Sequence, residues 1–295
     1  MAAGITAIGG NSAHAARTYG ISLAGWSLHR TIGEGEGKTP MLDMPRLARE
    51  EFGIEAIELV NKMLPPNEKP FDEMMPYLEQ LKKNAADHNV KILLIMVDGE
   101  GDIGHLEEAK REEAVTRHQK WVDAAAFFGG HSIRMNWKGE ANGWEKDPKV
   151  VDALVERSAP YFHKLCDYAD GKGINVIIEN HGGPSSNVPA MEKLMAAVKH
   201  PRFGTLPDYG NFPAGTDIYD SIDRLMPFAK AVSAKCYDFD DTTGLETKLD
   251  FAKLTEIVVD KHKYSGYIGI EFEGDRLSEF EGIKRAKALM DKLKA

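Results

Sequence analysis

Cysteine, long apolar runs and excess positive charge are all scarce in this sequence, and each shortage excludes a class of protein. The 295 residues include only two cysteines, Cys166 and Cys236, which lie far apart and outside any C-x-x-C pattern. We therefore expect two reduced thiols in a packed protein rather than a disulfide or a metal site. No stretch approaches the roughly 18 consecutive apolar residues of a membrane span. The net charge of −9 repels phosphate backbones, which makes nucleic acid a poor partner.

Three common motifs of catalysis and nucleotide binding are also missing. The sequence has no G-x-S-x-G nucleophile elbow, no phosphate-binding P-loop with its lysine, and no dinucleotide-binding glycine fingerprint. It does have a hydrophobic content of 42%, which is enough to bury one large core. A chain of this length can form two ordinary domains, but α/β barrels commonly run to about 250 residues as one domain.

The first residues differ in texture from the rest of the chain. The stretch before Arg17 is small, apolar and uncharged, and residues 13–15 read as an A-x-A cleavage pattern. The basic part of an export leader is missing, so residues 1–18 are either a leader remnant or a disordered arm. A leader makes the soluble protein a periplasmic one and disfavours phosphorylated sugars, which are mainly intracellular; an arm leaves it cytoplasmic. We predict one domain over residues 19–295.

From Tyr19 onward, short apolar runs alternate with longer stretches of helical spacing. The runs are apolar throughout, which is typical of parallel strands covered on both faces. Eight strand-then-helix units without a linker predict a single α/β (β/α)8 TIM barrel. The expected strands are 20–26, 56–60, 90–97, 131–136, 174–179, 203–208, 231–235 and 267–273. The expected helices are 43–52, 71–88, 107–128, 148–172, 188–198, 217–226, 250–263 and 278–293.

Polar side chains close these apolar runs, at the strand ends where barrel enzymes carry their active sites. Three of them are carboxylates that follow buried-looking runs: Glu179, Asp208 and Glu271. Grouping three anions away from water is unfavourable unless their pKa values rise or a divalent cation lies between them. An oxygen-rich ligand set suits Mg²⁺, Mn²⁺ or a similar ion. The sequence therefore predicts a divalent metal centre held by these three carboxylates.

Other polar residues at the same ends are expected to contact a substrate: Trp26, His29, Glu58, Arg134, Asn136, His181, Asn211 and Lys235. Several have a plainer alternative. Trp26 and His29 either form an aromatic wall for a sugar ring or only shape a loop. His181 either touches substrate or supports the site through hydrogen bonds.

Arg134 also allows two interpretations. It either grips an oxyanion or hydroxyl of the substrate, or it pairs with Asp98 or Glu58. The acidic segment 238–241, DFDD, is interpreted as a solvated loop rather than a second metal site.

Four of the strand-end segments together resemble a known superfamily. They are VIIENHGG at 176–183, GTLPDYGNF at 204–212, VSAKCYDFD at 232–240 and YIGIEFEG at 267–274. These segments are similar to the xylose isomerase-like superfamily, and closest to its group of sugar phosphate isomerases and epimerases. The resemblance extends over most of the chain from Tyr19. It implies a TIM barrel and a sugar substrate.

The resemblance also implies roles for individual residues. Epimerases of this superfamily bind a divalent metal through Glu, Asp, His and Glu from strands five to eight. By that pattern Glu179, Asp208 and Glu271 are metal ligands, and the two glutamates are the acid/base pair. The ion can be Mn²⁺, Mg²⁺, Co²⁺ or Zn²⁺.

Two positions depart from the superfamily pattern. The expected strand-seven histidine falls on Ser233, so a water molecule, His181 or a neighbouring group must complete the metal shell. Asn211 stands where epimerases and endonucleases carry a histidine. Lys235 lies one pleat beyond Ser233 on the same face, where it can contact substrate or carry a proton.

The resulting hypothesis is a metal-dependent sugar isomerase or epimerase that moves a proton next to a carbonyl through an enediolate. The departure at Ser233 makes elimination from a keto-sugar or a 3-keto-glycoside the leading alternative, which would make the protein a lyase or dehydratase. A non-catalytic sugar-binding barrel and a phosphodiester-cleaving nuclease are weaker alternatives. The acidic charge and missing histidines argue against the nuclease. The expected partner is a small sugar, and assembly into a homo-oligomer is left open.

Overall fold

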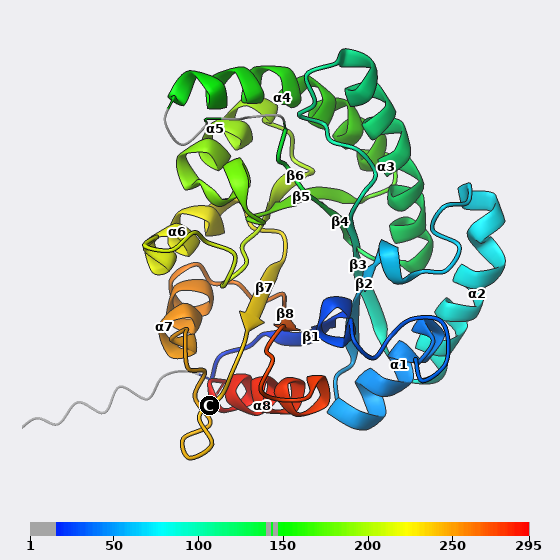
Figure 1. The fold of residues 1–295 in the computed structure, drawn as a ribbon, viewed down its shortest axis with the longest axis vertical. Helices are drawn as coiled ribbons and strands as arrows, with labels where there is room; N and C mark the ends of the chain where they lie inside the picture. The colour runs from blue at the N-terminus through cyan, green and yellow to red at the C-terminus, as the bar shows by residue number, and fades with distance from the viewer. Residues whose placement is uncertain (1–15, 140–142, 144–146, 295) are drawn as a thin grey trace, which may run out of the picture.

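The computed structural model describes residues 16–139, 143 and 147–294. The predicted cleavage pattern at residues 13–15 lies outside them. Within the described part, eight parallel strands form one sheet that curls on itself, and eight helices surround it (Figure 1). The predicted (β/α)8 barrel is therefore confirmed.

The observed elements follow the predicted units closely. The strands are β1 Gly20–Ala24, β2 Ala56–Val60, β3 Lys91–Val97, β4 Ser132–Met135, β5 Asn175–Glu179, β6 Phe203–Leu206, β7 Val232–Cys236 and β8 Tyr267–Phe272. The helices are α1 Met44–Arg46, α2 Phe71–Asp87, α3 Glu108–Phe128, α4 Pro148–Asp170, α5 Val188–Val198, α6 Ile218–Leu225, α7 Phe251–Thr255 and α8 Glu279–Lys292.

Two of the predicted helices continue as π-helical turns. Leu47–Glu51 extends α1, and Glu256–Lys261 extends α7. A π turn holds about one more residue than an α turn. Over so few residues the apolar spacing fits either geometry, so the sequence pattern does not separate them.

Local sequence explains where several helices begin. The side chain of Asp147 accepts a hydrogen bond from the Lys149 backbone at the start of α4. Asn187 does the same at the start of α5, and Ser278 at the start of α8. Such caps satisfy backbone donors that have no partner inside the helix, and each contributes about 1 kcal/mol.

The barrel closes between the segments of β6 and β7 by two isolated bridges rather than a full ladder. One joins Thr205 to Ala229, and the other joins Asp208 to Ser233. The Ser233 backbone donates to Pro207 at 3.0 Å, and the Tyr209 backbone donates to Ser233 at 3.1 Å. Asp208 is therefore held beside Ser233 by the closure of the barrel itself.

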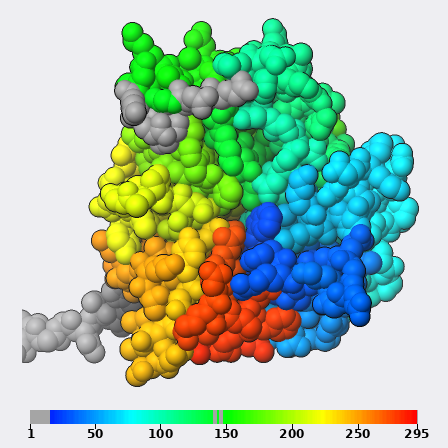
Figure 2. Space-filling view, in the orientation of Figure 1, coloured from blue at the N-terminus to red at the C-terminus, as the bar shows by residue number. Residues whose placement is uncertain are grey.

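The two ends of the described chain meet on one side of the barrel. β1 pairs with β8, and the blue N-terminal segment lies directly beside the red C-terminal segment in Figure 2. Ahead of β1, Arg17 forms an ion pair of 2.6 Å with Asp260 and donates to the Leu293 carbonyl at 2.9 Å. These contacts tie the segment before β1 to the π-helical turn that extends α7 and to the end of α8.

Two absences expected from the sequence can be compared with the described residues. Cys166 and Cys236 are both buried free thiols, as predicted. Among the described helices, none combines the length and apolar character that crossing a bilayer requires.

Candidate metal centre and active site

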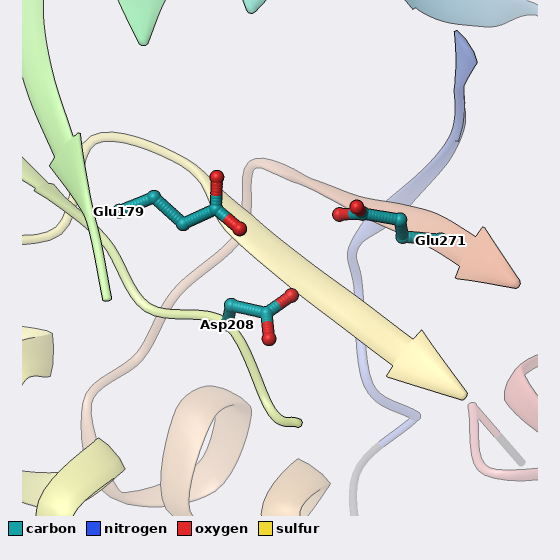
Figure 3. Close-up of side chains that lie close together, drawn as sticks. All are labelled: Glu179, Asp208 and Glu271. Atoms are coloured by element: carbon teal, nitrogen blue, oxygen red, sulfur yellow. The ribbon is translucent and has the colours of Figure 1, made fainter. Parts of the chain in front are cut away.

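Three carboxylates converge at the C-terminal ends of the strands. Glu179 ends β5, Asp208 follows β6, and Glu271 lies near the end of β8; Figure 3 shows the three side chains pointing toward one another. One oxygen from each lies within 4.8 Å of the others, and all three residues are buried. We call these three residues the central carboxylates.

Ser233 of β7 lies between two of the central carboxylates. Its Oγ is 2.6 Å from Asp208 Oδ2 and 2.8 Å from Glu271 Oε2. A hydroxyl has one proton and can donate to only one oxygen at a time. The other close contact, between Ser233 Oγ and the second carboxylate oxygen, therefore needs a proton on that carboxyl group or a cation nearby.

Glu179 has one satisfied oxygen and one that no hydrogen bond reaches. Asn211 Nδ2 donates to its Oε1 at 2.8 Å. Arg134 Nε lies 2.8 Å from Oε2, but the pair does not meet hydrogen-bond geometry. Oε2 is therefore a buried oxygen that has an ion-pair partner but no hydrogen bond, so it keeps a lone pair for a further cation.

Two buried cations already lie against the central carboxylates. Lys235 Nζ is 3.0 Å from Glu271 and 3.2 Å from Glu273. Arg134 Nη1 donates to Asp98 Oδ1 at 2.7 Å. Burial opposes the charge of both side chains, but the surrounding carboxylates outweigh it and raise the pKa of each. Because both cations are shared with other acids, they do not neutralise the central carboxylates in full.

The pKa values of the central carboxylates are pushed apart. Burial raises the pKa of Glu179 to about 8, against the opposing charge of Arg134. Burial also raises the pKa of Asp208 to about 7, against Lys235. At Glu271 burial acts the same way, but the charge and hydrogen bond of Lys235 outweigh it and lower the pKa. The proton is therefore held more tightly at Glu179 than at Glu271.

Two asparagines hold acid-bearing segments in place. Asn180 Nδ2 donates to the Asp208 carbonyl at 2.9 Å, and the Asp208 backbone donates back to Asn180 Oδ1 at 2.7 Å. Asn61 makes the same reciprocal pair with Asp98, at 2.9 Å in each direction. The predicted site did not include these two reciprocal hydrogen-bond pairs. Their signal in the sequence is an asparagine directly after the apolar run.

The loop after β5 shapes the mouth of the barrel. Its turn needs Gly182 and Gly183, which have φ angles of 79° and 59°. Ser186 Oγ donates to the Asn211 carbonyl at 2.6 Å, joining this loop to the one after β6. Between them lies an open hollow of about 400 Å³, lined by His181, Gly182, Gly210, Asn211, Phe212 and Pro213.

The imidazole of His181 faces this mouth as a neutral ring. Burial and the nearby charges of Arg134 and Lys235 lower its pKa to about 4. Its Nδ1 is buried and has no hydrogen bond. A substrate hydroxyl can supply that partner.

Glu58 lies inside the barrel. Ser22 Oγ donates to its Oε1 at 2.6 Å, and its Oε2 is buried without a hydrogen bond. A Cβ atom on Gly269 would lie 2.5 Å from Oε1, so this glycine leaves room for the carboxyl group. Burial raises the pKa of Glu58 to about 7. Its predicted contact with substrate stays a prediction.

The remaining predicted residues fall into two groups. Asn136 Nδ2 donates to Asp98 at 2.6 Å. Arg134 forms ion pairs with Asp98 and Glu179 rather than with Glu58. Trp26 and His29 follow β1 with ring centroids 6.4 Å apart, and His29 Nδ1 lies 2.7 Å from the Trp26 carbonyl. Their role as a wall for a sugar ring stays a prediction.

This fold and site together define a class of protein: a (β/α)8 barrel with a candidate metal site of buried carboxylates at the ends of its later strands. The chain belongs to the xylose isomerase-like TIM barrel family, whose model matches residues 45–295. The resemblance seen in the strand-end segments is therefore confirmed. No curated protein sequence gives a significant match to the chain.

Solved structures share the fold at low identity. A 3-keto-D-glucoside 4-epimerase from E. coli is 15% identical, with a TM-score of 0.68 and coverage of 94% of this chain and 99% of that one. A probable 3-DHS dehydratase from Bacillus anthracis is 17% identical, with a TM-score of 0.66 and coverage of 92% and 98%. A xylose isomerase-like TIM barrel protein from Mycobacterium smegmatis, in complex with magnesium, is 16% identical, with a TM-score of 0.63 and coverage of 95% and 98%.

Proposed function

We propose that the protein is a divalent-metal-dependent sugar isomerase or epimerase. The observation that carries this proposal is the convergence of Glu179, Asp208 and Glu271, with two glutamates facing each other across the group. The residues present fit a divalent cation, because their donors are carboxylate oxygens and one of those oxygens has no hydrogen bond. When bound, such an ion stabilises negative charge that builds on a substrate oxygen next to the reacting carbon.

The two glutamates divide the proton transfer. Ionised Glu271 removes the proton next to the substrate carbonyl, which gives an enediolate. Protonated Glu179 returns a proton on the opposite face or to the adjacent carbon, which gives the epimer or the isomer. Their pKa values, raised at Glu179 and lowered at Glu271, support this division.

The substrate contacts come from the polar residues around this pair. We assign hydroxyl or oxyanion contacts to Arg134, Asn136, His181 and Lys235. Arg134 and Lys235 contact central carboxylates, His181 lines the hollow, and Asn136 shares Asp98 with Arg134. We assign Trp26 and His29 to one wall of the site. Asn211 orients Glu179 through its hydrogen bond, and Glu58 forms the floor.

Elimination from a keto-sugar or 3-keto-glycoside is the second candidate, and the position of Lys235 favours it. The same base removes the proton next to the carbonyl, and the electron pair of that C–H bond forms a carbon–carbon double bond as the bond from the neighbouring carbon to oxygen breaks. The departing oxygen takes a proton from the ammonium group of Lys235. Lys235 lies 3.0 Å from Glu271, so base and donor stand on one side of the site. The E. coli epimerase and the Bacillus dehydratase named above support the two reaction classes.

Nuclear magnetic resonance in D₂O separates these reactions. The enzyme is loaded in turn with Mg²⁺, Mn²⁺, Co²⁺ and Zn²⁺ and given keto- and aldo-sugars with and without phosphate. Deuterium at a sugar carbon of changed configuration identifies an epimerase, and an unsaturated product or a released aglycone identifies a lyase. Glu179→Gln should abolish the reaction, whereas Glu79→Gln, on the exposed side of α2, should not. If neither product forms with any of the four metals, the proposal is refuted.

A further inference from the structure

The donor atoms around the candidate metal centre are all oxygens. Within the described ranges, the group that can hold an ion consists of Glu179, Asp208 and Glu271, without a histidine or a cysteine. Ser233 adds a further oxygen beside the centre, because its hydroxyl contacts two of the carboxylates. Ser233 is fully buried, and the bridge to Asp208 fixes its backbone beside the centre.

The neighbouring thiol points away from the centre. Successive residues of a strand face opposite sides of the sheet. Ser233 and Lys235 face the barrel interior, so Cys236 faces outward and packs in the apolar layer under the helices. The strand therefore offers the centre a hydroxyl and an ammonium group, and no sulfur.

The imidazole of His181 belongs to the mouth rather than to the centre. Its backbone N–H donates to Ser185 at 2.9 Å, and its ring lines the hollow formed with Gly210 and Phe212. Its nitrogens do not join the group of atoms that lie within 4.8 Å of one another. From that position the imidazole can contact a substrate, which leaves the ion to oxygen donors.

We propose that Ser233 makes this an all-oxygen centre whose occupant is a hard cation, Mg²⁺ or Mn²⁺, and that residue 233 sets this preference. The inference rests on the proposed metal centre and specifies its occupant. Nitrogen and sulfur donors add affinity for Zn²⁺ and other softer ions, whereas carboxylate and hydroxyl oxygens suit Mg²⁺ and Mn²⁺. Without an imidazole or thiolate, the centre offers Zn²⁺ little of the extra bonding that it gains elsewhere.

The test measures metal binding without any sugar. Mg²⁺, Mn²⁺ and Zn²⁺ are titrated calorimetrically into metal-stripped wild type and into Ser233→Cys, which replaces the hydroxyl by a thiol of similar size. The variant should increase the ratio of Zn²⁺ to Mg²⁺ affinity by at least about tenfold. Cadmium should give an ultraviolet cadmium–thiolate band with the variant and none with wild type.

Two further variants check the assignment. His181→Gln should leave the affinities for all three ions unchanged, and Asp208→Asn should weaken Mg²⁺ binding at least about tenfold. An unchanged ratio and no cadmium band in a folded Ser233→Cys would overturn the inference. Loss of Zn²⁺ affinity in His181→Gln would overturn it independently, because imidazole would then be a ligand.

These results are separable from the fate of the proposed function. A protein that binds Mg²⁺ with the expected ratio but turns over no sugar supports the all-oxygen centre and refutes the enzyme. Turnover of a sugar together with an unexpected affinity ratio supports the enzyme and refutes the all-oxygen centre. Unaltered Mg²⁺ binding in Asp208→Asn would refute the metal centre and this inference together.

Discussion

Two acidic groups in this chain contain three carboxylates each, and they differ in almost every physical respect. The central carboxylates are buried, and their charge exceeds that of their partners. The acidic loop, Asp238–Asp241, is paired by arginines instead: Arg276 bonds Asp238 at 2.9 Å and Asp241 at 3.2 Å. In the described part of the chain, only the first group can hold a metal ion. The acidic loop matches its prediction as a solvated segment.

The comparison shows why counting acids does not locate a site. In the acidic loop, the hydrogen bond from Arg276 lowers the pKa of Asp238, and backbone and side-chain donors of Thr243 lower the pKa of Asp240. Water and salt screen what remains. In the central group burial raises the pKa of Asp208, because its charged form is poorly solvated there. A cation would stabilise that charged form.

The largest expected effect comes from exchanging one acid in each group for its amide. Glu271→Gln should reduce turnover by about 10²–10⁴-fold, because it removes the proposed base. Asp241→Asn, which removes one acid from the acidic loop, should leave turnover unchanged. The measurement is the rate of deuterium incorporation into the substrate identified by the D₂O screen. Equal losses in the two variants would mean that the burial difference has no functional meaning.

The next largest effect is expected on stability, when a cation beside the central carboxylates is removed. Lys235→Met leaves Glu271 and Glu273 without their buried ammonium partner, at a cost of about 3–5 kcal/mol of unfolding free energy without metal. Added Mg²⁺ should restore part of the loss, since it supplies positive charge to the same oxygens. Urea unfolding with and without Mg²⁺ measures both quantities. A loss that Mg²⁺ leaves unchanged would contradict a shared electrostatic role.

Much of this comparison could be predicted from the sequence, for a definite reason. Carboxyl ends of parallel strands meet on one face, so Glu179, Asp208 and Glu271 could be grouped without knowing any register. Strands and helices were placed within a few residues because glycines and polar loops interrupt each apolar run. The family followed from the same strand-end segments.

Partner choice could not be predicted in the same way. When both faces of a strand are apolar, alternation no longer shows which side chains point into the barrel. The pairing of Ser22 with Glu58 and the sharing of Arg134 between Asp98 and Glu179 depend on that register. The reciprocal hydrogen bonds between Asn180 and Asp208 depend on how β5 and β6 lie beside each other in the sheet, which the sequence around either residue does not show.

A smaller effect is expected at Glu58, a buried acid outside the central group. Its pKa is about 7 in the folded protein against 4.5 for an ordinary glutamate, so the folded state keeps a proton that the unfolded state releases. Stability from this group is therefore present below about pH 4.5 and is lost as pH rises to about 7. Glu58→Gln removes that loss and should stabilise the protein at pH 8 by on the order of 3 kcal/mol, with little effect at pH 4.

The measurement for Glu58 is urea unfolding across this pH range, and the exposed Glu79→Gln serves as the matched control. Only the Glu58 variant should show a stability gain that grows with pH. A gain of the same size at pH 4 and pH 8 would assign the effect to packing rather than to the buried charge.

The smallest expected effect lies in the acidic loop. Arg276→Ala removes the bonds to Asp238 and Asp241, yet Arg285 Nη1 still pairs with Asp241, and all these groups are open to water. Exposed ion pairs contribute little because solvent screens them and long side chains lose freedom in forming them. The thermal midpoint should therefore stay within the scatter of repeated melts, in low and in high salt. A clear fall in the midpoint would mean that the acidic loop depends on its charge pairing as strongly as the buried group does, and the contrast between the two groups would fail.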